Sequence, residues 1–362
     1  MPDFYAAREL LQQAVTDRAF PGAAFGVFSK GSIIAAEGIG RFTYDATSPE
    51  ASAETIFDLA SVSKVLATAP LAMRLWQRGI LNLEQPVGEI LPEFLAGDSR
   101  RNAVTIHMLL AHTSGLPAHL KLYRLPEVER AASPEEAAER ALTACLTTPF
   151  IAEPGSRAVY SDIGYILLGR ALERLAGDSL NSLCDQEVFE PLELKSTRFR
   201  PAPEQQSRVA PTRDWEWRHR ILQGEVQDEN CALLGGVAGH AGVFSTVGDI
   251  LKLAAAILAP GGMFTGAAVD RFTRRESAPP GTSRTLGWDT PTPPSQSGSY
   301  FSAHSVGHLG YSGSSLWIDL DRQIAVALLT NRVYTEGGPA NAKIQQVRPA
   351  FHDAVMRPLL AD

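Results

Sequence analysis

The chain has 362 residues, of which 44% are hydrophobic and 20% are charged, and its formal net charge is −7. This length predicts two structural lobes, because a single hydrophobic core stops growing near about 250 to 300 residues. The acidic balance, without a long run of Lys or Arg, argues against nucleic acid or an anionic membrane surface as a partner and favours a small neutral or cationic substrate.

The cysteines and the N-terminus bear on the compartment. Cys145, Cys184 and Cys231 show no C-x-x-C spacing, so we interpret them as buried thiols and not as a disulfide framework or a zinc site. The opening MPDFYAARELLQQAV lacks the basic start and apolar block of a secretion signal, and no apolar stretch is long enough to span a bilayer. We therefore expect a cytoplasmic protein with no membrane insertion, an expectation that holds only if no leader has been removed. The oligomeric state stays open.

The predicted elements begin with a helix at roughly 3–17 and a hairpin of two β-rich runs, 23–28 and 32–38. A buried helix follows, with apolar positions recurring at intervals of three and four from Ser61 to a stop at Gly79. Ser61 is therefore expected at or near a helix N-terminus.

Helical signals separated by Pro-rich loops fill the chain from about 80 to 230 and predict a helical lobe. Strand signals return after a glycine-rich segment that begins at Gly235. The elements predicted there are a helix that Thr246 caps and that runs to Leu258, hairpin strands at 314–320 and 323–330, and a last helix at 349–360.

Strands thus lie at both ends of the sequence and helices in the middle. The economical architecture is an α/β fold of the α+β type, in which one antiparallel sheet is built from both chain ends, is flanked by helices and carries an inserted, mostly helical lobe. The expected domains are a sheet domain, 1–79 with 235–362, and a helical domain, 80–234, with the catalytic cleft between them.

Ser61-Val62-Ser63-Lys64 reads S-x-x-K, and a three-residue step on a helix puts both side chains on one face. A serine hydroxyl needs a neighbouring base to become a nucleophile, and a lysine desolvated in a cleft can be that base. The pattern should occur by chance roughly once in a chain of this length, so by itself it is better explained by a capping serine beside a surface lysine.

Two further segments change that balance. Tyr160-Ser161-Asp162 falls in a loop just before an apolar-periodic helix, and His308-Leu309-Gly310 leads into a strand whose glycines permit close backbone approach to a ligand. With Ser61-x-x-Lys64, and in this order, they resemble the three motifs of the serine β-lactamase and penicillin-binding protein superfamily, in its class C β-lactamase and DD-peptidase branch.

Three supporting segments are similar to one branch of this superfamily, the β-lactamase-related hydrolases that contain esterases, D-amino-acid peptidases and muropeptide amidases. They read FDLASVSK, LLAHTSGLP and GGVAGHAGVFST, and the likeness spans roughly 20–335. The resemblance implies a β-lactamase/transpeptidase-like fold and a serine hydrolase that forms an acyl-enzyme.

Carried onto this sequence, the resemblance implies that Ser61 attacks the substrate carbonyl and that Lys64 takes or relays its proton. Tyr160 would act as general base and then as acid to the leaving group. The backbone N–H groups of Ser61 and Tyr311 would form the oxyanion hole, with Gly310 beside them.

Two residues depart from the family's pattern. His308 stands where the lactamases have Lys and is mostly neutral near pH 7, so a fixed cation for a substrate carboxylate is expected to be missing and β-lactamase activity to be weak or absent. Asp162 stands where they have Asn; its charge should raise the pKa of Lys64 and favour Tyr160 as the base.

The remaining candidates have milder interpretations. His240 could shape the cleft floor and bind substrate, although a histidine satisfied by backbone groups is favoured, and His112 is expected to be structural. Asp228-Glu229-Asn230 either rims the pocket or is a solvated loop, and Trp215 and Trp217 are expected in core or lid packing. No metal-ligand spacing and no nucleotide fingerprint appears, so we expect no metal and no cofactor.

The substrate class stays open between a small-molecule ester, an amide and a peptidoglycan-derived molecule. Two alternatives to hydrolysis also stay open: a penicillin-binding or sensing module with little turnover, and an acyltransferase that uses the same serine. The loops at 118–132, 200–230 and 276–304 are expected to line the entrance and to select the substrate.

Overall fold

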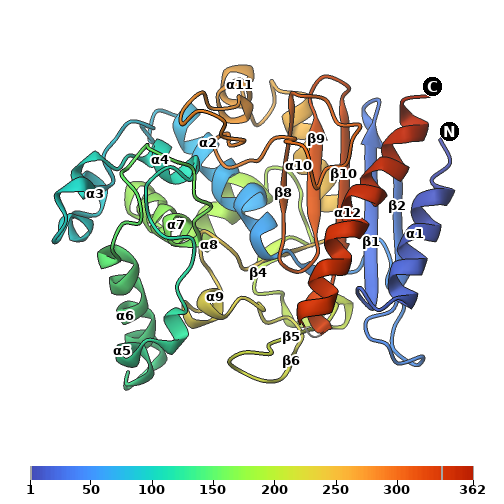
Figure 1. Ribbon diagram of the computed structural model, residues 1–362, viewed down its shortest axis with the longest axis horizontal. Coiled ribbons are helices and arrows are strands. Elements are labelled where there is room, and N and C mark those ends of the chain that lie inside the picture. The colour runs from blue at the N-terminus through green and yellow to red at the C-terminus, as the bar shows by residue number, and fades with distance from the viewer. Residues whose placement is uncertain (1, 336, 362) are drawn as a thin grey trace.

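The computed structural model of the protein describes residues 2–335 and 337–361. Its centre is a five-stranded antiparallel sheet in the order β2-β1-β10-β9-β8, so strands from both chain ends share one sheet (Figure 1). The predicted fold class is confirmed. The strands are β1 (Gly22–Ser29), β2 (Ser32–Gly40), β8 (Ser305–Leu309), β9 (Ser315–Asp319) and β10 (Ile324–Thr330).

Both predicted hairpins are present. Lys30 and Gly31 join β1 to β2 and both have positive φ, 52° and 83°, as the two central residues of a type I′ turn require. Strand β8 differs from the prediction, because the third motif ends this edge strand instead of leading into one. Its sequence, SVGHL, is short and has glycine at its centre, so it carries little strand signal.

Helices cover both faces of the sheet. Alternate residues of β1 point to opposite faces, so Phe25 packs with α1 (Tyr5–Thr16) and α12 (Gly337–Leu359), while Ala24 joins the main core with α10 (Val247–Leu258). Figure 1 shows α1 and α12 side by side against one face of the sheet, with α10 behind it. Thr246 caps α10 as predicted, accepting the N–H of Asp249.

The last helix starts earlier than predicted. Pro349, expected to open it, lies inside α12, which begins at Gly337. A proline in a helix leaves the carbonyl four residues earlier without its partner. Here that carbonyl belongs to Gln345, and it accepts a hydrogen bond from Gln296 Nε2 at 3.1 Å. A contact with a distant loop thus satisfies the group that Pro349 leaves free.

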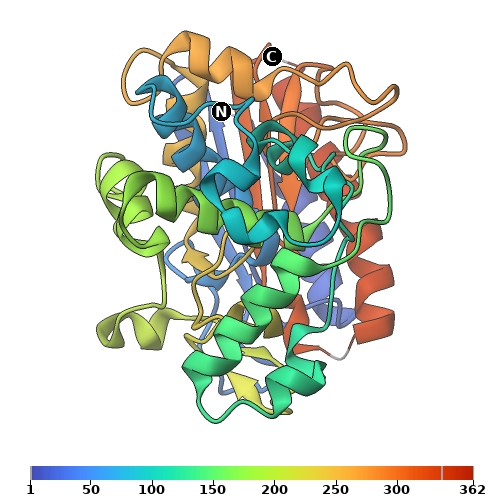
Figure 2. The ribbon, with the colours of Figure 1, turned by 90° about the vertical axis from the view of Figure 1, so that its left-hand side faces the viewer.

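The helical part of the molecule lies in front of the sheet in Figure 2. Its helices are α2 (Ala69–Gln77), α3 (Val87–Ile90), α4 (Ile106–Leu110), α5 (Pro126–Glu129), α6 (Pro134–Thr147), α7 (Asp162–Ala176), α8 (Leu180–Cys184), α9 (Glu229–Leu233) and α11 (Gly266–Thr273). Short strands join it to the sheet: β3 (Phe57–Asp58), β4 (Arg198–Phe199) and β7 (Val243–Ser245) form one small sheet, and β5 (Thr212–Arg213) pairs with β6 (Ile221–Leu222).

The three cysteines are buried and unpaired, as predicted. Among the residues that the structure describes, no helix is both long and apolar enough to cross a membrane.

Candidate active site

Ser61 sits on a tight turn at the start of a buried helical run. The expected single helix is divided into a 3-10 turn, Ala60–Val62, a π-helical turn, Lys64–Thr68, and α2. Asp58 fixes the entry, because one carboxylate oxygen accepts the N–H of Ala60 and the other accepts that of Gln227. Ala60 has φ of 48°, a strained conformation for a residue with a side chain, and such strain is typical of functional sites.

Lys64 is fully buried next to the serine. Its Nζ lies 3.1 Å from Ser61 Oγ, 2.7 Å from Asp162 Oδ1 and 2.8 Å from the carbonyl oxygen of His240. Three acceptors thus meet the three protons of an ammonium group. Burial acts to lower the pKa of Lys64, but Asp162 and Tyr160 outweigh it, so the pKa is raised and the side chain is a cation at neutral pH.

Tyr160 lies over the same ammonium group, with Lys64 Nζ 4.8 Å from its ring centroid. Burial raises the pKa of Tyr160, and the nearby Lys64 offsets this only in part. At rest the two side chains are therefore a phenol and an ammonium group. One proton must leave this pair before either member can act as a base, and the two groups titrate as a coupled unit.

His112 holds the second motif in place. Its ring packs between those of Tyr160 and Tyr165, at 4.7 and 4.8 Å between centroids, and its Nδ1 accepts the N–H of Ser161. Burial keeps the pKa of His112 well below its usual value, so the ring stays neutral and able to accept. Ser161 in turn caps α7 through the N–H of Gly164. His112 thus has a structural role, in which its ring packs against the ring of Tyr160.

Asp162 bridges two basic side chains at the start of α7. Oδ1 contacts Lys64, and Oδ2 lies 3.6 Å from Nδ1 of His119, a cavity residue that the sequence did not single out. Burial acts to raise the pKa of Asp162, but Lys64 and His119 hold it well below its usual range. The carboxylate is therefore ionised.

His308 lies on β8 and is 4% exposed. Its Nδ1 donates to the carbonyl oxygen of Leu309, which leaves Nε2 as the unprotonated nitrogen. Burial, then Lys64 and Arg284, lower the pKa of His308 to about 3. The ring is therefore neutral, and its centroid lies 5.7 Å from that of Tyr160.

A cation is nevertheless present beside this motif. The guanidinium of Arg284 lines the cavity, lies 5.5 Å from the centroid of the Tyr160 ring and is 3.7 Å from Asp289. The third motif itself supplies no cation, but Arg284 brings one to the same part of the cleft. No local pattern identified Arg284, because it reaches the site from an irregular loop that packs against β8.

Gly310 brings the third motif against the serine turn. A Cβ at this position would lie 2.4 Å from the carbonyl oxygen of Leu59, so only glycine permits the approach. Within the described chain, the N–H groups of Ser61 and Tyr311 donate no hydrogen bond to another protein group. They are two unused donors on adjoining segments, as an oxyanion hole requires.

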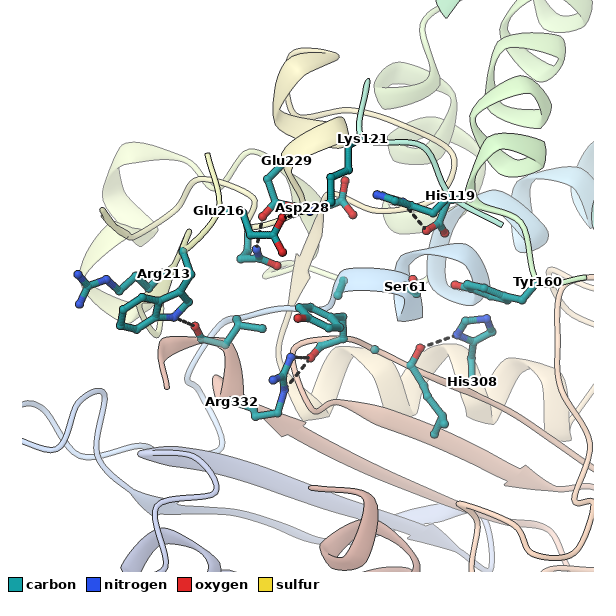
Figure 3. Close-up of a pocket in the computed structure, with 18 of the residues that line it drawn as sticks. Ser61, His119, Lys121, Tyr160, Arg213, Glu216, Asp228, Glu229, His308 and Arg332 are labelled. Carbon is teal, nitrogen blue, oxygen red and sulfur yellow. Dashed lines mark hydrogen bonds and ion pairs between the residues drawn. The ribbon is translucent and has the colours of Figure 1, made fainter. Parts of the chain in front are cut away.

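These groups open into a cavity of about 850 Å³. Figure 3 shows Ser61, Tyr160 and His308 together, with Glu216, Asp228 and Glu229 gathered away from them around Lys121. The lining comes from all three predicted loops, at 119–123, 213–229 and 284–289.

Three other candidates lie in or near the cavity. Asp228 and Glu229 line it, so this segment belongs to the pocket and is not merely a solvated loop. Trp215 lines the cavity as well. The ring of His240 does not lie among the lining side chains. It is buried, and it contacts the site in two ways: its Nε2 lies 2.9 Å from Oδ1 of the lining residue Asp228, and its carbonyl oxygen accepts a hydrogen bond from Lys64. The described residues contain no cluster of three or more side chains suited to hold a metal ion.

The chain matches the Beta-lactamase family over residues 7–348. It is 33% identical to the N-acetylmuramyl-L-alanine amidase of Bacillus subtilis (strain 168), covering 87% of this chain and 78% of that protein. The octameric penicillin-binding protein homologue from Pyrococcus abyssi has a similar fold, with a TM-score of 0.73 at 21% identity over 99% of this chain and 78% of that one. A class C β-lactamase from Rhodobacter sphaeroides has a TM-score of 0.73 at 22% identity over 98% and 99%.

The protein thus has the fold of the β-lactamases and of the penicillin-binding protein homologue. The chain belongs to the β-lactamase family, and the resemblance inferred from its three motifs is confirmed.

Proposed function

We propose that the protein is a serine hydrolase that forms an acyl-enzyme on Ser61 and cleaves an amide or ester bond. The observation that carries the proposal is a cavity lined by Ser61 and Tyr160, with the buried Lys64 ammonium behind it, 3.1 Å from Ser61 Oγ and 4.8 Å from the centroid of the Tyr160 ring. A nucleophile, a coupled proton-transfer pair and two free backbone donors are the parts that acyl transfer requires.

The reaction begins when the Lys64–Tyr160 pair has lost one proton. The resulting base takes the proton of Ser61 as Oγ bonds to the substrate carbonyl, and the charge on the carbonyl oxygen is stabilised by the N–H groups of Ser61 and Tyr311. Tyr160 then gives the proton to the leaving group as that bond breaks. A water molecule, deprotonated by the same pair, releases the acyl group and restores the Ser61 hydroxyl.

The substrate class that we propose is a peptidoglycan-derived amide. The Bacillus subtilis relative is named as an amidase of N-acetylmuramyl-L-alanine. Arg284, beside Tyr160, would hold a carboxylate on the substrate, as a cation suited to bidentate pairing. A cavity of about 850 Å³ accommodates a molecule larger than a simple ester.

We also propose that hydrolysis of β-lactams is weak. The neutral His308 leaves the third motif without its own charge, and Asp162 keeps a proton on the Lys64–Tyr160 pair. Arg284 opposes this expectation, because it supplies a nearby cation. The rate of nitrocefin hydrolysis measures which of these opposing effects is larger. A rate comparable to that with the best amide substrate would contradict the proposal.

The test of the hydrolase proposal compares Ser61→Ala with Ser207→Ala, a substitution at an exposed serine outside the cavity. Hydrolysis of p-nitrophenyl butyrate and of muramyl dipeptide is measured for each variant, together with the intact mass after a fluorophosphonate. We expect activity and adduct in the wild type and Ser207→Ala, and neither in Ser61→Ala. Activity that survives Ser61→Ala would refute the assigned nucleophile. A stable mass adduct with benzylpenicillin, without turnover of either substrate, would identify a penicillin-binding module.

A further inference from the structure

Two buried arginines hold the turn that follows the third motif. Arg348, from α12, donates through Nε to the carbonyl oxygen of Gly313 at 3.0 Å and through Nη2 to those of Gly310 and Ser314. Arg332 donates through Nε to the carbonyl oxygen of Tyr311 at 2.9 Å. The turn is therefore bound along its length by guanidinium donors.

The positive charge of these arginines faces backbone oxygens. Arg348 is 6% exposed and Arg332 is 1% exposed. Among the described residues, no carboxylate lies within ion-pair distance of either guanidinium group. Burial, and then the neighbouring Arg332, lower the pKa of Arg348 to about 9, which still leaves it charged at neutral pH. A buried charge compensated by carbonyl dipoles polarises the peptides that carry them.

The two arginines differ in which peptide they polarise. The carbonyl of Gly310 and the N–H of Tyr311 belong to one peptide unit, so Arg348 acts on the peptide between two residues that line the cavity. The carbonyl of Tyr311 belongs to the next unit, whose N–H is that of Ser312. Arg332 therefore binds the same turn without acting on the Tyr311 N–H through its own peptide bond.

We propose that Arg348 is a positioning residue that strengthens the oxyanion hole by polarising the Gly310–Tyr311 peptide. The inference rests on the proposed acylation of Ser61 and on the Tyr311 N–H as an oxyanion donor. A guanidinium on the carbonyl side makes that N–H a stronger donor to the developing oxyanion, because hydrogen bonds in a chain strengthen one another. The contribution concerns the transition state, so it should appear in kcat and leave KM little changed.

The test is the carbonyl stretch of the acyl-enzyme, measured by infrared difference spectroscopy with a substrate ¹³C-labelled at its carbonyl. Stronger donation to the acyl oxygen lowers the stretching frequency. In Arg348→Met we expect a higher frequency, and a kcat for acyl transfer lower by about 10- to 100-fold, somewhat less than the loss of a direct oxyanion donor. Arg332→Met, the matched control, removes a buried guanidinium from the same turn and should leave the frequency at its wild-type value.

Arg348→Lys keeps the charge but makes fewer of the carbonyl contacts, so it should give a frequency between those of the wild type and Arg348→Met. If Arg348→Met does not fold, the carbonyl frequency of Arg348→Lys alone tests the role of Arg348. A wild-type frequency in the Arg348 variants, or an equal shift in Arg332→Met, would overturn the inference. If no labelled acyl-enzyme forms in the wild type, the proposed function fails instead.

Discussion

Replacing Gly310 by Ala tests whether the contact between the third motif and the serine turn builds the oxyanion hole. The added Cβ would lie 2.4 Å from the Leu59 carbonyl oxygen, where ordinary contact begins at 3.4 Å. The two segments must therefore separate by about 1 Å. Neither is free to move, because Gly310 N–H is bonded to Ser314 at 2.7 Å and Leu59 N–H to Val243 at 3.0 Å.

A displacement of about 1 Å at a catalytic geometry costs about 100-fold in rate, or about 2.7 kcal/mol of transition-state stabilisation. Strain of this kind also lowers the free energy of unfolding by about 1 to 3 kcal/mol. We expect Gly310→Ala to reduce kcat for p-nitrophenyl butyrate about 100-fold, with a smaller change in KM. Urea unfolding measures the loss of stability separately.

Gly262→Ala is the matched control, because a Cβ at that position meets no atom within 4 Å. It should leave kcat and the unfolding midpoint at their wild-type values. A folded Gly310→Ala variant with wild-type kcat would refute the reasoning, since the oxyanion donors would then tolerate the separation.

Three further substitutions probe the charges of the cavity. Asp162→Asn removes the charge that raises the pKa of Lys64, so the rise of kcat/KM with pH should move to lower pH; an unchanged pH profile would contradict the assigned ion pair. Burial raises the pKa of Glu229 from 4.5 to about 7. Above pH 7 this carboxylate is therefore ionised in the folded state, where its burial makes the charge destabilising. Glu229→Gln should therefore raise the free energy of unfolding at pH 8 by about 1 to 2 kcal/mol, after a discount for solvent screening, and change it little at pH 4, as urea titrations at both pH values would show. Arg284→Gln should raise KM about 10-fold or more for substrates that carry a carboxylate and leave KM for neutral esters unchanged; equal effects on both would exclude a carboxylate partner.

Local signals account for the parts of the fold that were predicted. The hairpin of β1 and β2 and the helix that Thr246 caps depend on neighbouring residues, and both are present. The start of α12 was missed because the partner of the Gln345 carbonyl is Gln296, far away in the chain. The edge strand β8 was missed because its pairing with β9, and not its own composition, makes it a strand.

The site shows the same division. Ser61, Lys64 and Tyr160 were singled out from the order of the three motifs, and the structure brings them together. Arg284 and Arg348 were missed, since one sits on an irregular loop and the other on a helix far from the motifs in sequence, and only the folded chain brings them to β8 and its turn.

The central claim is that Ser61 carries the acyl group. The most direct measurement is peptide mapping of the wild-type protein quenched in acid during turnover of p-nitrophenyl acetate. We predict an acetyl group on the peptide that contains Ser61, formed in a burst and lost as substrate is exhausted. An acetyl group on another side chain, or turnover with no acylated peptide at any time, would contradict it.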